Sequence, residues 1–267
     1  MRLYALALYI FLYAPIAVIA LFSFNAGKHA TQLTGFSLQW YGKALSNPFV
    51  VNALKTSFTV ALISALAATI CGTLAAVALQ GVRGRLRLFY DALVYMAVMV
   101  PGIVIGIATL IALVTLFDIA NPLLTGLFGA GAWQLGLGKG SLIAAHGLFT
   151  MSLVIVTVRA RLQGMDRSLL EAADDLGAPP MRAFLQITLP QIAPAVLAGF
   201  LLAFTFSFDD FIIAFFTAGS ETTLPIYVFS SIRRGVTPEI NAIGTLVLAA
   251  SLVLLVAAQL ILRKRGR

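Results

Sequence analysis

The segment Glu171-Ala-Ala-Asp-Asp-Leu-Gly177, followed after nine residues by Ile187-Thr-Leu-Pro190, is the most informative part of this sequence. It is polar and carries charge, whereas the whole chain is 60% hydrophobic and only 10% charged. Soluble domains carry roughly 25% charged residues. The composition therefore predicts a membrane protein and argues against a soluble α/β enzyme. The quoted segment indicates an element outside the membrane that docks with a protein partner.

Six apolar runs are long enough to cross a bilayer as helices, which takes about 20 residues. They cover residues 3–24, 53–79, 88–117, 141–158, 195–218 and 242–262. The first is too long for a signal-peptide core and lacks a polar cleavage region. The third contains Pro101, which predicts a kink or a steep tilt. In the second, the four-residue repeat of Ala68, Gly72 and Ala76 either admits a neighbouring helix or belongs to a generic alanine-rich helix.

Lys and Arg residues near the ends of these runs predict the orientation, because cytoplasmic loops are enriched in both. One set of connections carries twelve of them: Arg2, Arg83, Arg85, Arg87, Arg159, Arg161, Arg167, Arg182, Arg263, Lys264, Arg265 and Arg267. The opposite set carries five: Lys28, Lys43, Lys139, Arg233 and Arg234. Both termini and the loop 159–194 are therefore expected in the cytoplasm. Because the net charge of +8 comes from these flanking residues, it does not indicate nucleic-acid binding.

The cytoplasmic loop is predicted to hold a pair of short helices. Residues 165–176 are rich in helix formers and end at Gly177, a residue suited to closing a helix. Pro190 and Pro194 are expected to mark the start of the fifth span. An amphipathic helix that binds only lipid headgroups is an alternative, but acidic residues argue against it because anionic lipids attract basic faces. Those acidic residues are Asp166, Glu171, Asp174 and Asp175.

Glu171-Ala-Ala, Gly177 and Ile187-x-Leu-Pro190 resemble the EAA loop of bacterial ABC importer permeases, spacing included. Other segments look like the spermidine/putrescine permease family, so that the likeness covers nearly the whole chain. They are Gln39-Trp-Tyr41, Val100-Pro-Gly-Ile103, Val156-x-Val-x-Ala-Arg-Leu162, Ser207-Phe-Asp-Asp210, Leu224-Pro-Ile-Tyr227 and Gly235-Val-Thr-Pro-Glu-Ile-Asn241.

The resemblance implies an all-α, six-helix type I importer permease in the bacterial inner membrane. Residues 1–267 would form one transmembrane domain that contains the coupling loop 159–194. Its partners would be a second permease subunit, two ATPase subunits and an external binding protein. ATP and magnesium would be bound by the ATPases, so this chain needs no cofactor and is not an enzyme. The ATPase contact would consist of Glu171, Ala172, Ala173, Leu176 and Gly177.

Asp209 and Asp210 interrupt the apolar run 195–218. A carboxylate at membrane depth costs on the order of a few kcal/mol and by default faces a cavity or a partner. Aromatic residues, among them Phe206 and Phe208, surround the pair. Carboxylates among aromatic faces suit an ammonium ion, which predicts a path for a cationic solute such as a polyamine. A hydrogen bond between subunits or a helix break is the alternative.

The segment around 225–234 is expected outside the membrane, as an outer gate or a contact for the binding protein. Pro225, Tyr227, Arg233 and Arg234 are its candidate residues. Importers of another small amine or of an amino-acid-like solute remain open. A self-sufficient channel or secondary transporter is disfavoured because no internal repeat is visible. An intramembrane enzyme is disfavoured because no nucleophile–base pair can be assembled.

Overall fold

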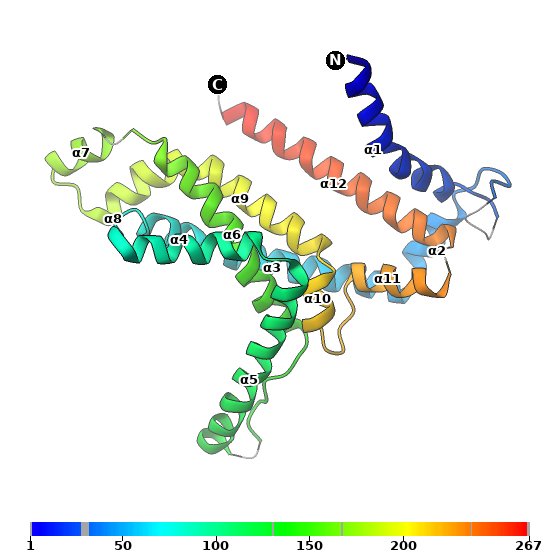
Figure 1. Ribbon diagram of the computed structural model, residues 1–267, viewed down its shortest axis with the longest axis horizontal. Coiled ribbons are helices and arrows are strands. Elements are labelled where there is room, and N and C mark those ends of the chain that lie inside the picture. The colour runs from blue at the N-terminus through cyan, green and yellow to red at the C-terminus, as the bar shows by residue number, and fades with distance from the viewer. Residues whose placement is uncertain (1, 28–31, 130, 167, 236, 266–267) are drawn as a thin grey trace. The chain divides into compact units, whose positions relative to one another are not determined.

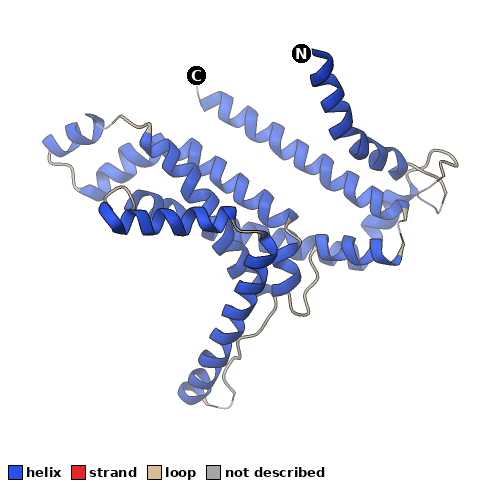
Figure 2. Cartoon of the chain, viewed as in Figure 1, coloured by secondary structure: helices blue, strands red, loops and turns tan. Residues whose placement is uncertain are grey.

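The structure is a computed structural model, and it describes residues 2–27, 32–129, 131–166, 168–235 and 237–265. These residues form helices and loops and no strand (Figure 2), apart from one isolated bridge between Asn25 and Phe36. The prediction of an all-α fold is confirmed. Of the basic residues that set the predicted orientation, Lys28, Arg167 and Arg267 lie outside the described residues.

The helices follow one another along the chain as labelled in Figure 1. They are α1 (Arg2–Ser23), α2 (Gln39–Ser46), α3 (Pro48–Ala78), α4 (Gly84–Met99), α5 (Gly102–Phe128), α6 (Lys139–Gln163), α7 (Ser168–Asp175), α8 (Pro180–Ala183), the π-helical turn η1 (Phe184–Thr188), α9 (Leu189–Asp209), α10 (Ile212–Thr217), α11 (Leu224–Arg234) and α12 (Pro238–Arg265).

Five helices of the described chain are long and apolar enough to cross a membrane. They are α1, α3, α5, α6 and the continuous helix Pro180–Asp209 that joins α8, η1 and α9. The sixth predicted span, 242–262, lies within α12, of which Pro238–Val253 forms a shorter apolar stretch. The structure is therefore that of a multi-pass helical membrane protein, and six spans are compatible with it.

The third predicted span is not one kinked helix. It is divided at Pro101 into α4 and α5, and α5 alone is long enough to span. Proline has no N–H to donate and forces the preceding residue out of the helical region. Val100 accordingly adopts an extended backbone, with φ −70° and ψ 136°. The apolar helix then continues to Phe128, beyond the predicted end at residue 117.

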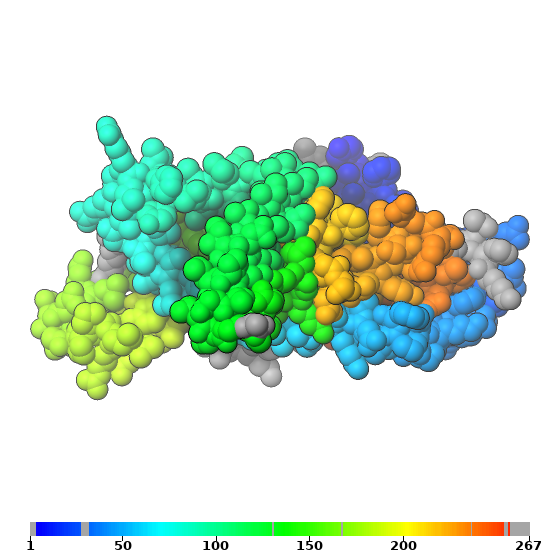
Figure 3. Space-filling model, turned by 90° about the horizontal axis from the view of Figure 1, so that it is seen from below, coloured from blue at the N-terminus to red at the C-terminus, as the bar shows by residue number. Residues whose placement is uncertain are grey.

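The chain divides into two compact units, residues 1–55 with 224–267 and residues 56–223. In the first unit, α12 packs against α1 and α2. In the second, α6 is central and packs against α9, α4 and α10. The helix α5 extends away from the other long helices of the second unit (Figure 1). Figure 3 looks onto α5, shown in green, whose apolar side chains are mostly exposed.

Small residues bring α3, α6 and α9 close together around Val154. A Cβ at Gly72 would lie 3.0 Å from the Val154 Cβ and 3.1 Å from the carbonyl oxygen of Met151. A Cβ at Gly199 would lie 3.4 Å from the Val154 Cγ1. Within a membrane, helices associate by close packing of this kind. Of the two interpretations of the Ala68–Gly72–Ala76 repeat, close approach by another helix is confirmed at Gly72.

Candidate functional site

The predicted coupling segment forms the short helix α7, and most of its candidate residues are exposed. Glu171 and Ala172 are exposed, and Leu176, just beyond the helix, is 87% exposed. Ala173 is buried, because α7 packs against η1 of the same chain. At the start of α7, the Ser168 backbone N–H donates to Asp166 Oδ1 at 2.9 Å and holds the pKa of that carboxyl below its usual value. The candidate residues open to a partner are therefore Glu171, Ala172, Leu176 and Gly177.

Gly177 closes α7 as the sequence predicted. Its φ of +70° lies in the left-handed region, which favours glycine. The Ala178 N–H donates to the Ala173 carbonyl and the Gly177 N–H to the Asp174 carbonyl, both at 2.9 Å. This pair of hydrogen bonds is the Schellman arrangement, which satisfies the last carbonyls of a helix. The direction in which the chain leaves α7 is thus fixed by the backbone of Gly177.

After a short turn at residues 176–179, the segment that follows α7 leads into the membrane as one helix. Helix α8 passes through η1 into α9, so that one continuous helix runs from Pro180 to Asp209. Pro190 stands in the first turn of α9, as the sequence predicted, and Pro194 lies inside α9. The helix itself begins earlier, at Pro180, because η1 continues into α9 without a break. The wider turn at η1 lies directly before α9, and such turns accommodate local irregularities of the hydrogen-bond ladder. Met181 and Leu185 in this segment are exposed, as is Leu176.

An ion pair fastens α4 to α6 at the end of α6 that leads into α7. The Arg159 guanidinium donates to the Asp91 carboxylate, and Arg87 Nε lies 3.8 Å from the other oxygen of Asp91. Two residues further along α6, Arg161 Nε donates to the Gln191 carbonyl of α9 at 3.1 Å. In the sequence, these arginines indicated the orientation in the membrane and not this ion pair. The pair was missed because its two members are 68 positions apart in the chain.

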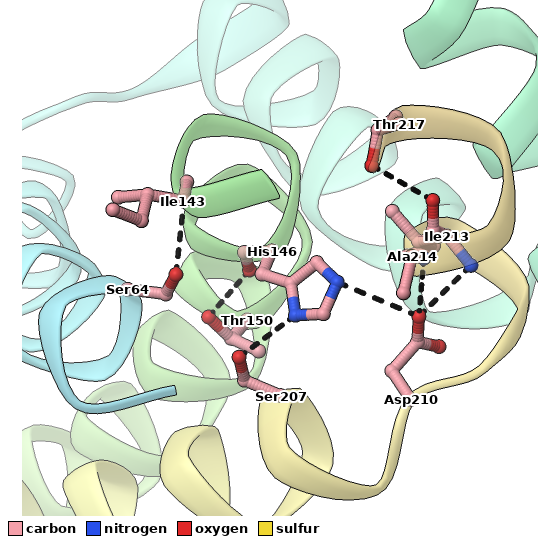
Figure 4. A network of polar contacts seen from close by, with 9 residues as sticks. All are labelled: Ser64, Ile143, His146, Thr150, Ser207, Asp210, Ile213, Ala214 and Thr217. Atoms are coloured by element: carbon pink, nitrogen blue, oxygen red, sulfur yellow. Dashed lines mark hydrogen bonds and ion pairs between the residues drawn. The ribbon is translucent and has the colours of Figure 1, made fainter. Parts of the chain in front are cut away.

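Asp209 and Asp210 do not continue one helix. Helix α9 ends at Asp209, and Asp210 is extended, with φ −71° and ψ 122°. Its Oδ2 accepts hydrogen bonds from the backbone N–H groups of Ile213 at 2.8 Å and Ala214 at 3.1 Å (Figure 4). Asp210 therefore caps α10. The helix break that the sequence left as an alternative is present here.

His146 lies beside Asp210 in the buried part of the second unit. Its side chain is 2% exposed, and its Nδ1 is 2.8 Å from Ser207 Oγ of α9. Its Nε2 points toward Asp210 Oδ2 at 3.7 Å (Figure 4), which is too long for a hydrogen bond. Nε2 has no hydrogen-bond partner among the described residues. The local sequence around His146 does not indicate this contact, because Ser207 lies 61 positions away in the chain.

The aromatic residues near these carboxylates face different partners. The Phe208 ring stacks on Phe204, with centroids 5.9 Å apart. Phe206 is 47% exposed and lies 6.4 Å from the ring of Phe149. Within the part of the chain that the structure describes, no group of three or more His, Cys, Asp or Glu side chains could hold a metal ion.

The predicted outer segment forms the helix α11. Tyr227 and Glu239 both accept hydrogen bonds from the Asn47 side-chain amide, at 3.3 Å and 3.0 Å. Arg233 and Arg234 are exposed at the end of α11, and Pro225 stands in its first turn. Within the first unit, Tyr227 thus ties α11 to the junction between α2 and α3, and the two arginines remain on the surface.

Comparison with known proteins agrees with this architecture. The family of inner membrane components of binding-protein-dependent transport systems matches residues 68–265. The chain is 41% identical over 243 residues to the putrescine transport system permease protein PotI of Escherichia coli (strain K12), which covers 90% of this chain and 82% of that protein. It is 37% identical to the spermidine/putrescine transport system permease protein PotC of the same organism, over 98% of this chain and 93% of PotC.

Solved structures give the same fold at lower identity. A chain of a bacterial ABC transporter involved in the import of the acidic polysaccharide alginate matches with a TM-score of 0.75 and 16% identity, over 100% of this chain and 96% of that chain. At that identity the likeness concerns the fold alone. Because the family match spans most of the chain and both relatives are permease proteins, the prediction of a non-catalytic membrane subunit is confirmed. The chain belongs to the family of inner membrane components of binding-protein-dependent transport systems.

Proposed function

We propose that this chain is the permease subunit of an ATP-driven importer that carries polyamines, such as putrescine and spermidine, across the bacterial inner membrane. The observation that carries the proposal is the identity of 37–41% to two polyamine permeases over 90–98% of the chain. The exposed carboxylate of Asp209 in an otherwise apolar helix supports a cationic solute. Nearby Phe206 offers an exposed aromatic ring, which attracts ammonium groups.

The helix α7 is proposed to be the contact through which ATPase subunits move the membrane helices. Glu171 offers a carboxylate to donors at the edge of a groove, while exposed Ala172 permits close approach and Leu176 fills an apolar pocket. Closure of the ATPase dimer on ATP would push α7 as a rigid lever. The continuous helix Pro180–Asp209 then carries the displacement toward Asp209.

The remaining partners are proposed on the same basis. ATP and magnesium are bound by two ATPase subunits, and an external binding protein delivers the solute near α11. A second permease subunit completes the path. An apolar groove of about 510 Å³ between α5 and α6 supports this, because Ala108, Ala112, Ala144 and Ala145 line part of it. Small side chains are typical of surfaces where transmembrane helices meet.

Reversal of the charge at Glu171 tests the coupling role. We expect Glu171→Lys to leave membrane insertion intact but to reduce putrescine import per ATP hydrolysed in proteoliposomes that hold the complete complex. Asp175→Lys is the matched control, because Asp175 is exposed on the same short helix but outside the predicted contact. Equal import per ATP in Glu171→Lys and the unsubstituted complex would refute the coupling role of α7.

A further inference from the structure

The two neighbouring carboxylates at the end of α9 differ in every contact that they make. We propose that Asp209 is the carboxylate that meets the ammonium group of the solute, whereas Asp210 and His146 are positioning residues that hold the break between α9 and α10. This inference rests on the proposed function, since it assigns the solute contact within the same path. It replaces a shared role for the pair with two separate roles.

The Asp210 carboxylate is already engaged within the chain. Its Oδ2 accepts two backbone N–H groups of α10, at 2.8 Å and 3.1 Å, and faces His146 Nε2 at 3.7 Å. Its side chain is only 18% exposed. A solute that paired with this carboxylate would have to compete with the donors that begin α10. Asp210 is therefore suited to capping a helix rather than to releasing and rebinding a passing cation.

His146 links this cap to the neighbouring helices. Through Nδ1 it contacts Ser207 on α9, three residues before the break, and through Nε2 it faces Asp210 beyond the break (Figure 4). At the other end of α10, Ser141 Oγ of α6 donates to the Thr217 carbonyl at 2.7 Å. Helix α10 is thus attached to α6 near both of its ends. The buried imidazole fixes where α9 stops and where its last residue, Asp209, projects.

The Asp209 carboxylate, in contrast to that of Asp210, is not engaged within the part of the chain that the structure describes. It is the last residue of α9, it is exposed, and no hydrogen bond or ion pair joins it to another described residue. It shares one exposed helical face with Leu202, Thr205 and Phe206, which precede it by seven, four and three positions. A carboxylate on an apolar face of a membrane helix needs a cation or water. Of the two, only Asp209 is free to receive an ammonium group beside an aromatic ring.

The two roles require different properties of the side chain, and this separates them. A helix cap needs a short acceptor, and Asn caps as well as Asp, so charge is dispensable. A contact with an ammonium group needs the charge, and one additional methylene is tolerable where the side chain projects into open space. Asn and Glu substitutions at the two positions should therefore have crossed effects.

The experiment compares four single variants, Asp209→Asn, Asp209→Glu, Asp210→Asn and Asp210→Glu, by labelled putrescine uptake per complex recovered from membranes. We expect Asp209→Asn to lower uptake by roughly tenfold or more, because it removes a charge-assisted contact. Asp209→Glu should retain most of the uptake of the unsubstituted complex. Asp210→Asn should remain within about threefold of the unsubstituted complex, since Asn keeps the cap. Asp210→Glu should lose activity, because the longer side chain misplaces the cap.

The positioning role of His146 is tested by comparing double variants with the corresponding single variants. His146→Ala and Asp210→Ala act on one contact, so the double variant should be little worse than the more impaired single variant. His146→Ala combined with Asp209→Asn should instead show the product of the two separate defects. These comparisons use uptake per recovered complex, so a general loss of assembly does not produce the pattern.

Three results would overturn the inference. Normal uptake by Asp209→Asn with loss in Asp210→Asn would assign the solute contact to Asp210, while uptake by the unsubstituted complex still upheld the proposed function. Failure of Asp209→Asn to assemble would make Asp209 a contact with a partner subunit. Absence of amine uptake by the unsubstituted complex would overturn the proposed function and this inference with it.

Discussion

The end of α7 at Gly177 offers a graded test of whether transport depends on a rigid coupling helix. A Cβ at Gly177 would have no neighbour within 4 Å, so a substitution there changes the backbone preference and not the packing. An ordinary L-residue at φ +70° costs about 1–2 kcal/mol, and Asn costs less because it tolerates this region. Proline cannot adopt this φ and also removes the N–H that bonds the Asp174 carbonyl.

A cost of 1–2 kcal/mol lowers the ratio of ordered to disordered α7 ends by about 5–30-fold. We therefore expect solute imported per ATP hydrolysed to fall in the order Gly177, Gly177→Asn, Gly177→Ala, Gly177→Pro. Uptake and ATPase activity would be measured together in proteoliposomes. Gly164→Ala is the matched control, because Gly164 ends α6 at an ordinary φ of −92°. Unchanged import per ATP in Gly177→Pro would refute the rigid-lever reasoning.

Two further predictions concern assembly and topology. Arg159→Asp should lower the recovery of folded complex, because breaking this partly buried pair costs about 1–3 kcal/mol, a value between those of exposed and buried pairs. The double variant Asp91→Arg with Arg159→Asp should restore the recovery. No restoration in the double variant would show that the pair does not act as a unit. Cysteines are introduced at Ser168 or Lys139 in a Cys71→Ala background and treated with an impermeant thiol reagent from outside. The cysteine at position 139 should be labelled and the one at position 168 should not, and the opposite result would reverse the topology.

Local patterns predicted much of this fold. The apolar runs match long helices because membrane helices must satisfy their own backbone hydrogen bonds. Gly177 predicted the end of α7 because few other residues adopt its φ. Pro101 predicted an irregularity, although the result is a full break into α4 and α5. These features depend on residues within a few positions of one another, which a sequence displays directly.

The remaining features depend on partners distant in the chain. The Asp91–Arg159 pair and the Ser207–His146 contact join positions 68 and 61 apart. Asp210 could not be recognised as a cap from an apolar run that hides the end of α9. The inward orientation of Ala173 follows from the packing of α7 against η1. The contacts of α7 and α11 with partner subunits, and the single-domain organisation over 1–267, stay predictions.

The central claim is that this chain, with its partner subunits and binding protein, imports polyamines at the expense of ATP. The most direct measurement is accumulation of labelled putrescine in proteoliposomes with and without ATP, with ion gradients collapsed. We expect ATP-dependent accumulation that unlabelled spermidine suppresses and unlabelled neutral amino acids do not. Accumulation without ATP in matched proteoliposomes that carry an imposed ion gradient, or suppression by amino acids but not by polyamines, would contradict ATP-driven polyamine import.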